Sequence, residues 1–145
     1  MERESIHLKV PSCLLYIGPI LAFIRELAQQ LGFCQTRTEN IELIIDEICS
    51  NAIEHGSETS ASEVELTLVL DATQLEILVR DKGKKVQNNW LTPGKLDEIS
   101  REMSPDGERG HGLFIARRLS DQMEIHPNAL GGTDVRVVFY RPAPS

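Results

Sequence analysis

The segment VELTLVLDATQLEILVRD, which spans Val64–Asp81, decides the fold because it contains two β-strands and the turn that joins them. Apolar and polar side chains alternate on both sides of the polar turn Asp71–Gln74. A period of two is typical of a strand that buries one face. So short a connection joins neighbouring antiparallel strands. The segment therefore predicts a β-hairpin whose buried face needs a second layer to cover it.

The sequence before the hairpin supplies one strand and two helices. Residues 6–10 alternate as a strand does. Apolar residues at helical spacing predict a first helix over residues 18–31 and a second over residues 36–55. Thr36, with Glu39 three residues later, resembles a capping box at the start of the second helix. These helices are candidates for the layer that covers the hairpin.

The sequence after the hairpin opens with a long irregular stretch. Residues Lys82 to Arg109 are rich in glycine, proline, amides and charges. So long a stretch inside a compact domain is typical of a functional lid. A helix over residues 113–119 and strands at 123–125 and 135–139 follow, with a turn at Gly131-Gly132 between the strands.

The order of these elements is strand, helix, helix, two strands, lid, helix and two strands. Strand runs joined by hairpins, with helices available to cover one face, predict an α/β fold of the two-layer α+β sandwich type with a mixed, mainly antiparallel sheet. The order differs from the strict alternation of a doubly wound fold. A length of 145 residues without repeats predicts a single domain over residues 1–145.

Composition and charge argue against several classes of function. Hydrophobic residues make up 41% and charged residues 26% of the chain, as in ordinary globular proteins. The formal net charge of −7 argues against a nucleic-acid partner, since phosphate backbones need a basic surface. The sequence shows neither a signal peptide nor an apolar run of membrane-spanning length. Three cysteines without metal-type spacing are expected to be reduced thiols, so we expect a cytoplasmic location.

A row of polar side chains lies along the second predicted helix. Glu47, Asn51 and His55 are spaced by four, so they stack at the border of the apolar stripe. A carboxylate beside a cavity can act as a general base, and an amide oxygen suits Mg²⁺, which prefers oxygen ligands and keeps several waters. The alternative for each residue alone is the solvated edge of an amphipathic helix, and His55 fits best at the helix end.

Two glycine-containing motifs lie at the ends of predicted elements. Asp81-Lys82-Gly83 places an acid at a strand end, where it can accept a hydrogen bond from an exocyclic amine, and the glycine lets backbone approach a flat ring. Arg109-Gly110-His111-Gly112 precedes a helix, whose free N–H groups and dipole favour an anion. The guanidinium group of Arg109 has several N–H donors that can bind a phosphate. Taken alone, the first motif is more typical of a plain turn, and the second is equally typical of a hinge.

Taken together and in this order, the motifs resemble the Bergerat-type ATPases of the GHKL superfamily. The segment Asp46–Gly56 resembles their N-box, Asp81-Lys82-Gly83 the first glycine box, Arg109–Leu113 the second and Gly132-Thr133 the last. The pattern E-x-x-x-N-A-x-x-H-G in so short a chain is most similar to the anti-sigma-factor serine kinases. The resemblance covers nearly the whole chain and implies a Bergerat-type ATP-binding fold.

The resemblance also implies which residues bind the base and the phosphates of ATP. Asp81 would read the adenine amine, Gly83 would line the base pocket and Thr133 would support it. The Gly110-His111-Gly112 loop would contact the phosphates through its backbone.

Further residues would carry the chemistry of phosphate transfer with Mg²⁺. Glu47 would be the general base towards the attacking hydroxyl, and Asn51 would hold Mg²⁺. A contact from Arg109 to the γ-phosphate follows from its position and charge. The first glycine box departs from the family pattern, because Lys85 stands where a second glycine is usual.

The resemblance implies a protein serine/threonine kinase that acts as an anti-sigma factor. Its substrate would be a STAS-type anti-anti-sigma protein, and it would sequester a sigma factor as a homodimer. Two alternatives stay open: a non-catalytic ATP-gated binding module, and a detached catalytic domain of the histidine-kinase type. Phosphotransfer to a cognate antagonist would separate the kinase from the binding module.

Overall fold

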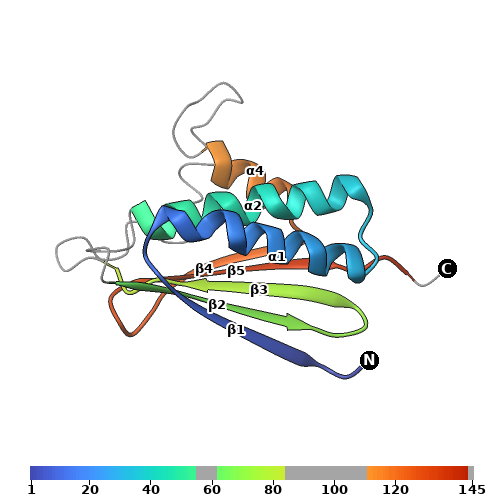
Figure 1. The fold of residues 1–145 in the computed structure, drawn as a ribbon, viewed down its shortest axis with the longest axis horizontal. Helices are drawn as coiled ribbons and strands as arrows, with labels where there is room; N and C mark the ends of the chain where they lie inside the picture. The colour runs from blue at the N-terminus through green and yellow to red at the C-terminus, as the bar shows by residue number, and fades with distance from the viewer. Residues whose placement is uncertain (55–61, 84–110, 144–145) are drawn as a thin grey trace.

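The structure, a computed structural model, describes residues 1–54, 62–83 and 111–143. Its elements form two layers, a five-stranded sheet and a layer of helices on one face of that sheet (Figure 1). The strand order is β1-β2-β3-β5-β4. In chain order the elements are β1 (Glu4–Pro11), the 3-10 turn η1 (Leu14–Tyr16), α1 (Ile17–Gln30), α2 (Gln35–Glu54), β2 (Glu63–Leu70), β3 (Gln74–Arg80), α4 (His111–Leu119), β4 (Gln122–Pro127) and β5 (Thr133–Tyr140).

The predicted two-layer α+β fold is confirmed, and the sheet is antiparallel throughout the described strands, where the sequence predicted a mainly antiparallel one. The reason is the position of the last strand. β5 lies between β3 and β4 and runs opposite to both. The last hairpin therefore places its second strand, not its first, against the hairpin of β2 and β3.

The core lies between the helices and one face of the sheet. Alternate residues of β2, β3 and β5 are buried there, which gives the period of two seen in the sequence. The apolar stripe expected on α2 is also buried. Its buried apolar residues are Ile41, Ile44, Ile45, Ile48, Cys49 and Ala52. Helix α1 contributes Ile17, Ile20, Ile24 and Ala28 to the same core.

The turn between β2 and β3 is held by the side chain of Asp71. Its Oδ1 accepts hydrogen bonds from the backbone N–H groups of Thr73 (2.8 Å) and Gln74 (3.1 Å). An acid that bonds the backbone two residues later is a common turn device. The predicted hairpin is therefore confirmed, although Gln74 already belongs to β3.

The start of α2 differs from the expected capping box. The helix begins at Gln35, so Thr36 lies inside its first turn and is not the capping residue. The backbone N–H of Thr38 already donates to the carbonyl oxygen of Cys34 at 2.9 Å. This backbone bond starts the helix before Thr36, and the Thr36–Glu39 pattern is not used as a cap.

The face of the sheet away from the helices carries a row of charges of alternating sign. Lys9, Glu65, Arg80 and Asp134 are direct neighbours across the strands in this order. Lys9 forms an ion pair with Glu65, and Arg80 forms one with Asp134. Each pair of opposite charges on neighbouring strands stabilises a sheet by about 0.2–1 kcal/mol.

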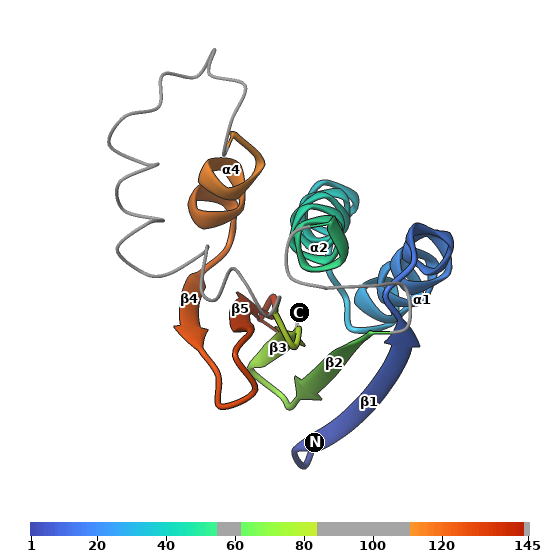
Figure 2. The same ribbon diagram turned by 90° about the vertical axis from the view of Figure 1, so that its left-hand side faces the viewer.

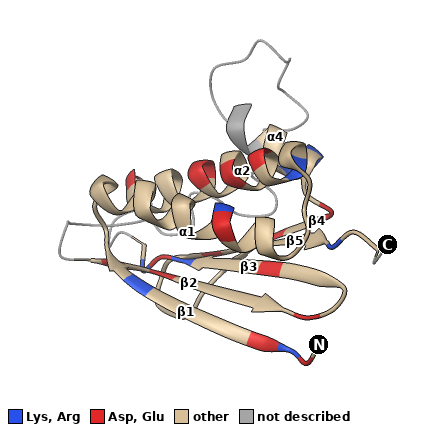
Figure 3. Cartoon of the chain, turned by 45° about the vertical axis from the view of Figure 1, so that its right-hand side comes forward, with Lys and Arg blue, Asp and Glu red and all other residues tan. Residues whose placement is uncertain are grey.

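The helix layer is mainly acidic along α2, in line with the negative net charge (Figure 3).

Some sequence predictions fall outside the described residues. Of the lid expected over residues 82–109, only Lys82 and Gly83 are described. His55 at the end of the polar row and the Arg109-Gly110 pair before α4 also lie outside. Among the helices of the described segments, none combines the length and apolar character that a membrane crossing requires.

Substitution of Ile44 by alanine tests the packing of α2 on the sheet. Ile44 is fully buried, whereas its neighbour Leu43 is 46% exposed. Ile44→Ala leaves a cavity in the core, so we expect it to lower the free energy of unfolding by about 2–5 kcal/mol. Leu43→Ala is the matched control and should lower it by about 1 kcal/mol at most. Urea denaturation measures both values, and equal losses would contradict the assignment of the buried face.

Candidate functional site

One end of the molecule collects the segments to which the sequence assigns functional residues. The end of β3, the turn between β4 and β5, the C-terminal end of α2 and the start of α4 all lie there (Figures 1 and 2). The antiparallel pairing of β3 with β5 explains part of this arrangement, because the end of one strand meets the start of the other. Residues distant in the sequence are thereby brought together.

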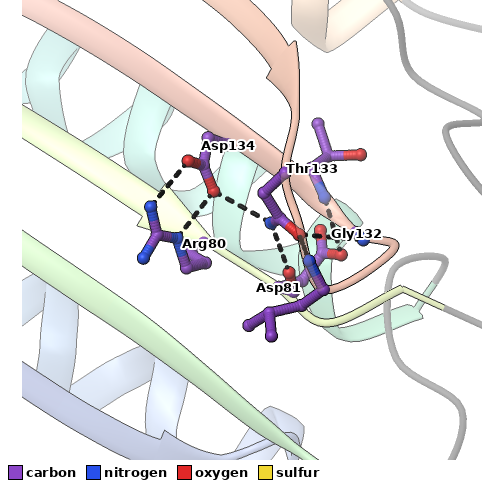
Figure 4. A network of polar contacts seen from close by, with 7 residues as sticks. Arg80, Asp81, Gly132, Thr133 and Asp134 are labelled. Atoms are coloured by element: carbon purple, nitrogen blue, oxygen red, sulfur yellow. Dashed lines mark hydrogen bonds and ion pairs between the residues drawn. The ribbon is translucent and has the colours of Figure 1, made fainter.

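The carboxylate of Asp81 lies at the centre of this end. Asp81 follows β3 directly and is only 5% exposed. Its Oδ1 accepts a hydrogen bond from the backbone N–H of Gly83 (2.8 Å). It accepts a second from the backbone N–H of Thr133 (3.2 Å; Figure 4). Within the described residues, the hydrogen bonds to this carboxylate end on Oδ1. No hydrogen bond from a described residue ends on Oδ2.

Two glycines allow the end of β3 to approach the β4–β5 turn. Gly83 has a φ of +72°, a left-handed conformation that side chains disfavour. A Cβ at this position would also collide with the carbonyl oxygen of Gly131, and a Cβ on Gly132 would lie 2.6 Å from Oδ1 of Asp81. Both glycines are therefore needed to bring backbone donors to the carboxylate. That Gly83 also lines a base pocket stays a prediction.

The side chain of Asn128 organises the β4–β5 turn and was not singled out in the sequence. Its Oδ1 accepts hydrogen bonds from the backbone N–H groups of Leu130 (2.9 Å) and Gly132 (3.0 Å). Its Nδ2 donates to the carbonyl oxygen of Asp81 (2.8 Å) and to Oδ1 of Asp134 (3.0 Å). An asparagine shortly before a glycine pair is a turn signal, but the contact with Asp81 requires the pairing of β3 with β5.

Glu47 and Asn51 lie on the half of α2 that reaches this end of the molecule. Both are half-buried, at the border of the apolar stripe, as the spacing by four predicted. Cys49, between them in sequence, points into the core, where burial raises the pKa of its thiol to about 12. This thiol is therefore a core group, as expected from its helical position, and Glu47 and Asn51 remain the polar candidates on the helix.

The remaining predicted residues are placed by their elements. Thr133 opens β5, is 3% exposed, and gives Asp81 its backbone N–H. His111 and Gly112 form the start of α4. The structure therefore joins Asp81, Gly83 and Thr133 by direct hydrogen bonds. The C-terminal half of α2, to which Glu47 and Asn51 belong, runs towards the same end of the molecule (Figure 1).

A family model described as a histidine kinase-like ATPase domain matches residues 10–139. The chain belongs to this family. The matched range includes α2, β3 and the β4–β5 turn, so the family assignment covers every described part of the candidate site. The resemblance read from the motifs is thereby confirmed.

Named relatives of this histidine kinase-like ATPase domain include proteins called serine-protein kinase RsbW. The chain is 29% identical over 127 residues to the protein of Bacillus cereus (strain AH820) and 30% identical over 128 residues to that of Bacillus thuringiensis (strain Al Hakam). Each alignment covers 86% of this chain and 79% of the relative.

A solved structure gives an independent comparison of the fold. The chain resembles the crystal structure of the RsbU and RsbW domains of a protein from Mycobacterium tuberculosis, with a TM-score of 0.63 and 23% sequence identity. The match covers 97% of this chain and 34% of that longer chain. This chain therefore spans about a third of the length of that protein, and at this identity the likeness concerns the fold.

The electrostatics of this histidine kinase-like ATPase domain are unusual at Asp81. Burial raises the pKa of Asp81 to about 6, and the charge of Asp134 acts in the same direction, whereas the two backbone N–H donors oppose the rise. Asp81 is thus a carboxylate at neutral pH, but one that the fold holds at a cost in stability. A buried carboxylate can accept a hydrogen bond from an amino group through an oxygen to which no described residue donates.

The amide oxygen of Asn51 suits a magnesium ion that is also bound by phosphates. The described residues contain no group of three or more His, Cys, Asp or Glu side chains that could hold a metal ion. The amide oxygen of Asn51 is instead one neutral oxygen donor. Mg²⁺ in nucleotide sites takes few protein ligands and completes its shell with phosphate oxygens and water. Asn51 therefore fits such an ion only together with a nucleotide.

The stability of the protein without ligand should depend on pH through Asp81. Between about pH 4 and pH 6 the native state holds a proton that the unfolded chain has released, so stability falls as pH rises through this window and stays level above it. Asp81→Asn removes the charge. We expect the free energy of unfolding of Asp81→Asn, relative to the wild type, to rise by up to about 3 kcal/mol between pH 4 and pH 7.

Thermal and urea unfolding across this pH range measure the difference. Other carboxylates titrate in both proteins, so the difference isolates Asp81. A difference that stays constant from pH 4 to pH 8 would show that the carboxylate has an ordinary pKa.

Proposed function

We propose that this chain is an ATP-dependent protein serine/threonine kinase that acts as an anti-sigma factor. The observation that carries the proposal is the buried Asp81 carboxylate, which is fixed through Oδ1 and offers Oδ2 to an outside donor. The family supplies the ATPase domain, and the relatives named serine-protein kinase RsbW supply the class of reaction.

Asp81 recognises the adenine base in this proposal. The exocyclic amine of adenine donates to Oδ2, while Thr133 and Gly83 keep the carboxylate from turning. Hydrogen bonds to a charged acceptor contribute about 1.5–3 kcal/mol. In a base that carries a carbonyl oxygen in place of the amine, this oxygen would lie against Oδ2 of Asp81. Two acceptors cannot form a hydrogen bond, so the site selects adenine.

Glu47, Asn51 and the start of α4 act on the phosphates. Glu47 takes the proton of the substrate's serine or threonine hydroxyl. The hydroxyl oxygen then bonds to the γ-phosphorus, while the bond from that phosphorus to the bridging oxygen of ADP breaks. Backbone N–H groups at His111 and Gly112 face phosphate oxygens at a helix N-terminus. Asn51 holds Mg²⁺, which when bound neutralises charge on the phosphates. Arg109 contacts the γ-phosphate.

The partners in this proposal are proteins. The phosphorylated partner is a STAS-type anti-anti-sigma protein, and the sequestered partner is a sigma factor, bound by a homodimer of this chain. A net charge of −7 suits a basic protein surface better than a nucleic acid. We place the protein in the cytoplasm as a single domain over residues 1–145, in keeping with its three free cysteines.

A second candidate function is a binding module that uses ATP without transferring phosphate. It is favoured by one observation, the lysine at position 85 where the first glycine box of the family usually has a second glycine. In such a module Asp81 would still bind adenine, and Glu47 would have no catalytic part.

Phosphotransfer separates the two candidates and tests Glu47. The wild type, incubated with γ-labelled ATP and STAS-type proteins of the same organism, should label one of them on serine or threonine. Glu47→Gln keeps the shape but removes the base, so labelling should fall by about 10²–10⁴-fold with little change in ATP affinity. Glu39→Gln, at an exposed position of the same helix, is the control and should label normally. ATP binding without any labelling by the wild type would favour the binding module.

Calorimetric titration with Mg²⁺-ATP tests the base site. Asp81→Asn presents an amide N–H₂ or a weaker neutral acceptor to the adenine amine, so ATP affinity should fall by about ten- to a hundredfold. Thr67→Ala, on the outer face of β2 away from the site, serves as the control and should bind as the wild type does. Unchanged affinity in Asp81→Asn would remove Asp81 from the nucleotide site.

A further inference from the structure

The side chain of Asn128 makes every hydrogen bond that an amide can make. Its oxygen accepts two, from Leu130 and Gly132, and its nitrogen donates two, to Asp81 and Asp134. The four bonds measure 2.8–3.0 Å. The surrounding groups fix which atom is nitrogen and which is oxygen, because two are backbone donors and two are acceptors. No other side chain of this length supplies two donors and two acceptors.

These bonds link the turn to the carboxylate that the proposed function assigns to adenine. Gly132, whose N–H is held by Asn128, directly precedes Thr133, whose N–H holds Oδ1 of Asp81. The backbone of Asp81 is held as well, since its carbonyl oxygen accepts from Nδ2 of Asn128. Asn128 therefore restrains Asp81 at its backbone and, through the turn, at its carboxylate.

An ion pair on the outer face of the sheet in turn holds Asn128. Nε and Nη2 of Arg80 donate to the two carboxylate oxygens of Asp134, each at 2.9 Å (Figure 4). Oδ1 of Asp134 also accepts from Asn128. Burial disfavours the charge of Asp134, but these hydrogen bonds outweigh burial and lower its pKa. The chain of contacts thus runs from Arg80 through Asp134 and Asn128 to Asp81.

We propose that Asn128 is a positioning residue that sets the selection of adenine over other purines, by holding Asp81 and the β4–β5 turn in the geometry that the base requires. The inference rests on the proposed function, since it assumes that Asp81 faces the base. It adds that selectivity depends on a residue that does not itself touch the nucleotide, and that the Arg80–Asp134 pair supports this residue from the far face of the sheet.

The test compares ATP with ITP, whose base carries a carbonyl oxygen in place of the amine. Titration calorimetry at pH 8, where Asp81 is ionised, gives both affinities and their ratio. We expect the wild type to prefer ATP. Asn128→Ala should lower this preference about tenfold, with the loss confined to ATP, because one well-placed hydrogen bond is worth about a factor of ten or more. Asn128→Asp should lower it further, because a carboxylate would face the acceptors at Asp81 and Asp134.

A purely structural role of Asn128 would give a different result. Partial unfolding lowers the concentration of competent sites and weakens ATP and ITP binding alike, so the ratio would not change. Thermal unfolding of each variant confirms that the titrations are made on folded protein. Asp134→Ala is a second variant in case the asparagine substitutions do not fold, and it should lower the same ratio by a smaller factor because the turn keeps its own bonds.

The matched control is Glu76→Ala. Glu76 pairs with Arg136 on the same face of β3 and β5, and among the described residues it makes no hydrogen bond or ion pair with the β4–β5 turn, so this variant should keep the wild-type ratio. An unchanged ratio in Asn128→Ala and Asp134→Ala, with a wild type that prefers ATP, would overturn the positioning role and leave the proposed function standing. A wild type that binds neither nucleotide, or both equally, would overturn both.

Discussion

The antiparallel pairing of β3 with β5 is the constraint on which the candidate site depends. It brings Asp81 next to Thr133, although the two residues are 52 positions apart in the chain. It also brings Gly83 against Gly131 and Gly132, at a distance that only glycines permit. Helix α2 packs on the same sheet through its buried apolar residues, and Glu47 and Asn51 lie at the border of that buried face.

The buried carboxylate of Asp81 lowers the stability of the free protein, although the proposed function needs it. A charged group that is almost fully buried, with its pKa raised by burial, weakens the folded state at neutral pH. Among the described residues, no cation forms an ion pair with this carboxylate. The residue beside it, Arg80, instead pairs with Asp134 on the other face of the sheet. Such an arrangement makes sense if a ligand supplies the missing donor, because binding then relieves a cost that the free protein carries.

Much of the fold could be predicted from the sequence, because the periods of apolar residues are strong. The alternation in β2, β3 and β5 and the stripe on α2 all mark buried faces. The position of β5 between β3 and β4 could not be obtained in this way, since periodicity shows which face of a strand is buried but not which strand lies beside it. The 3-10 turn η1 was also missed, because three residues are too few to show a period.

Part of the candidate site could likewise be predicted from the sequence, and part could not. Asp81, Gly83 and Thr133 were found because they belong to short motifs that a linear reading can recognise. Asn128 and the Arg80–Asp134 pair were not found, because their importance lies in contacts between strands that are distant in the sequence. The roles of Glu47 and Asn51 stay predictions, since a helical spacing places side chains on one face but does not show what they bind.

The pairing of β3 with β5 also bears on how the protein is made. A chain that emerges from the ribosome N-terminus first completes β1, α1, α2, β2 and β3 long before β5 is available. Pairing between strands so far apart in the chain is among the slower steps of folding, because the closure entropy is lost before the contacts form. The donor from Thr133 and the turn held by Asn128 arrive with the last strands. A nascent chain therefore lacks the hydrogen bonds that hold Asp81 until β4 and β5 have been made.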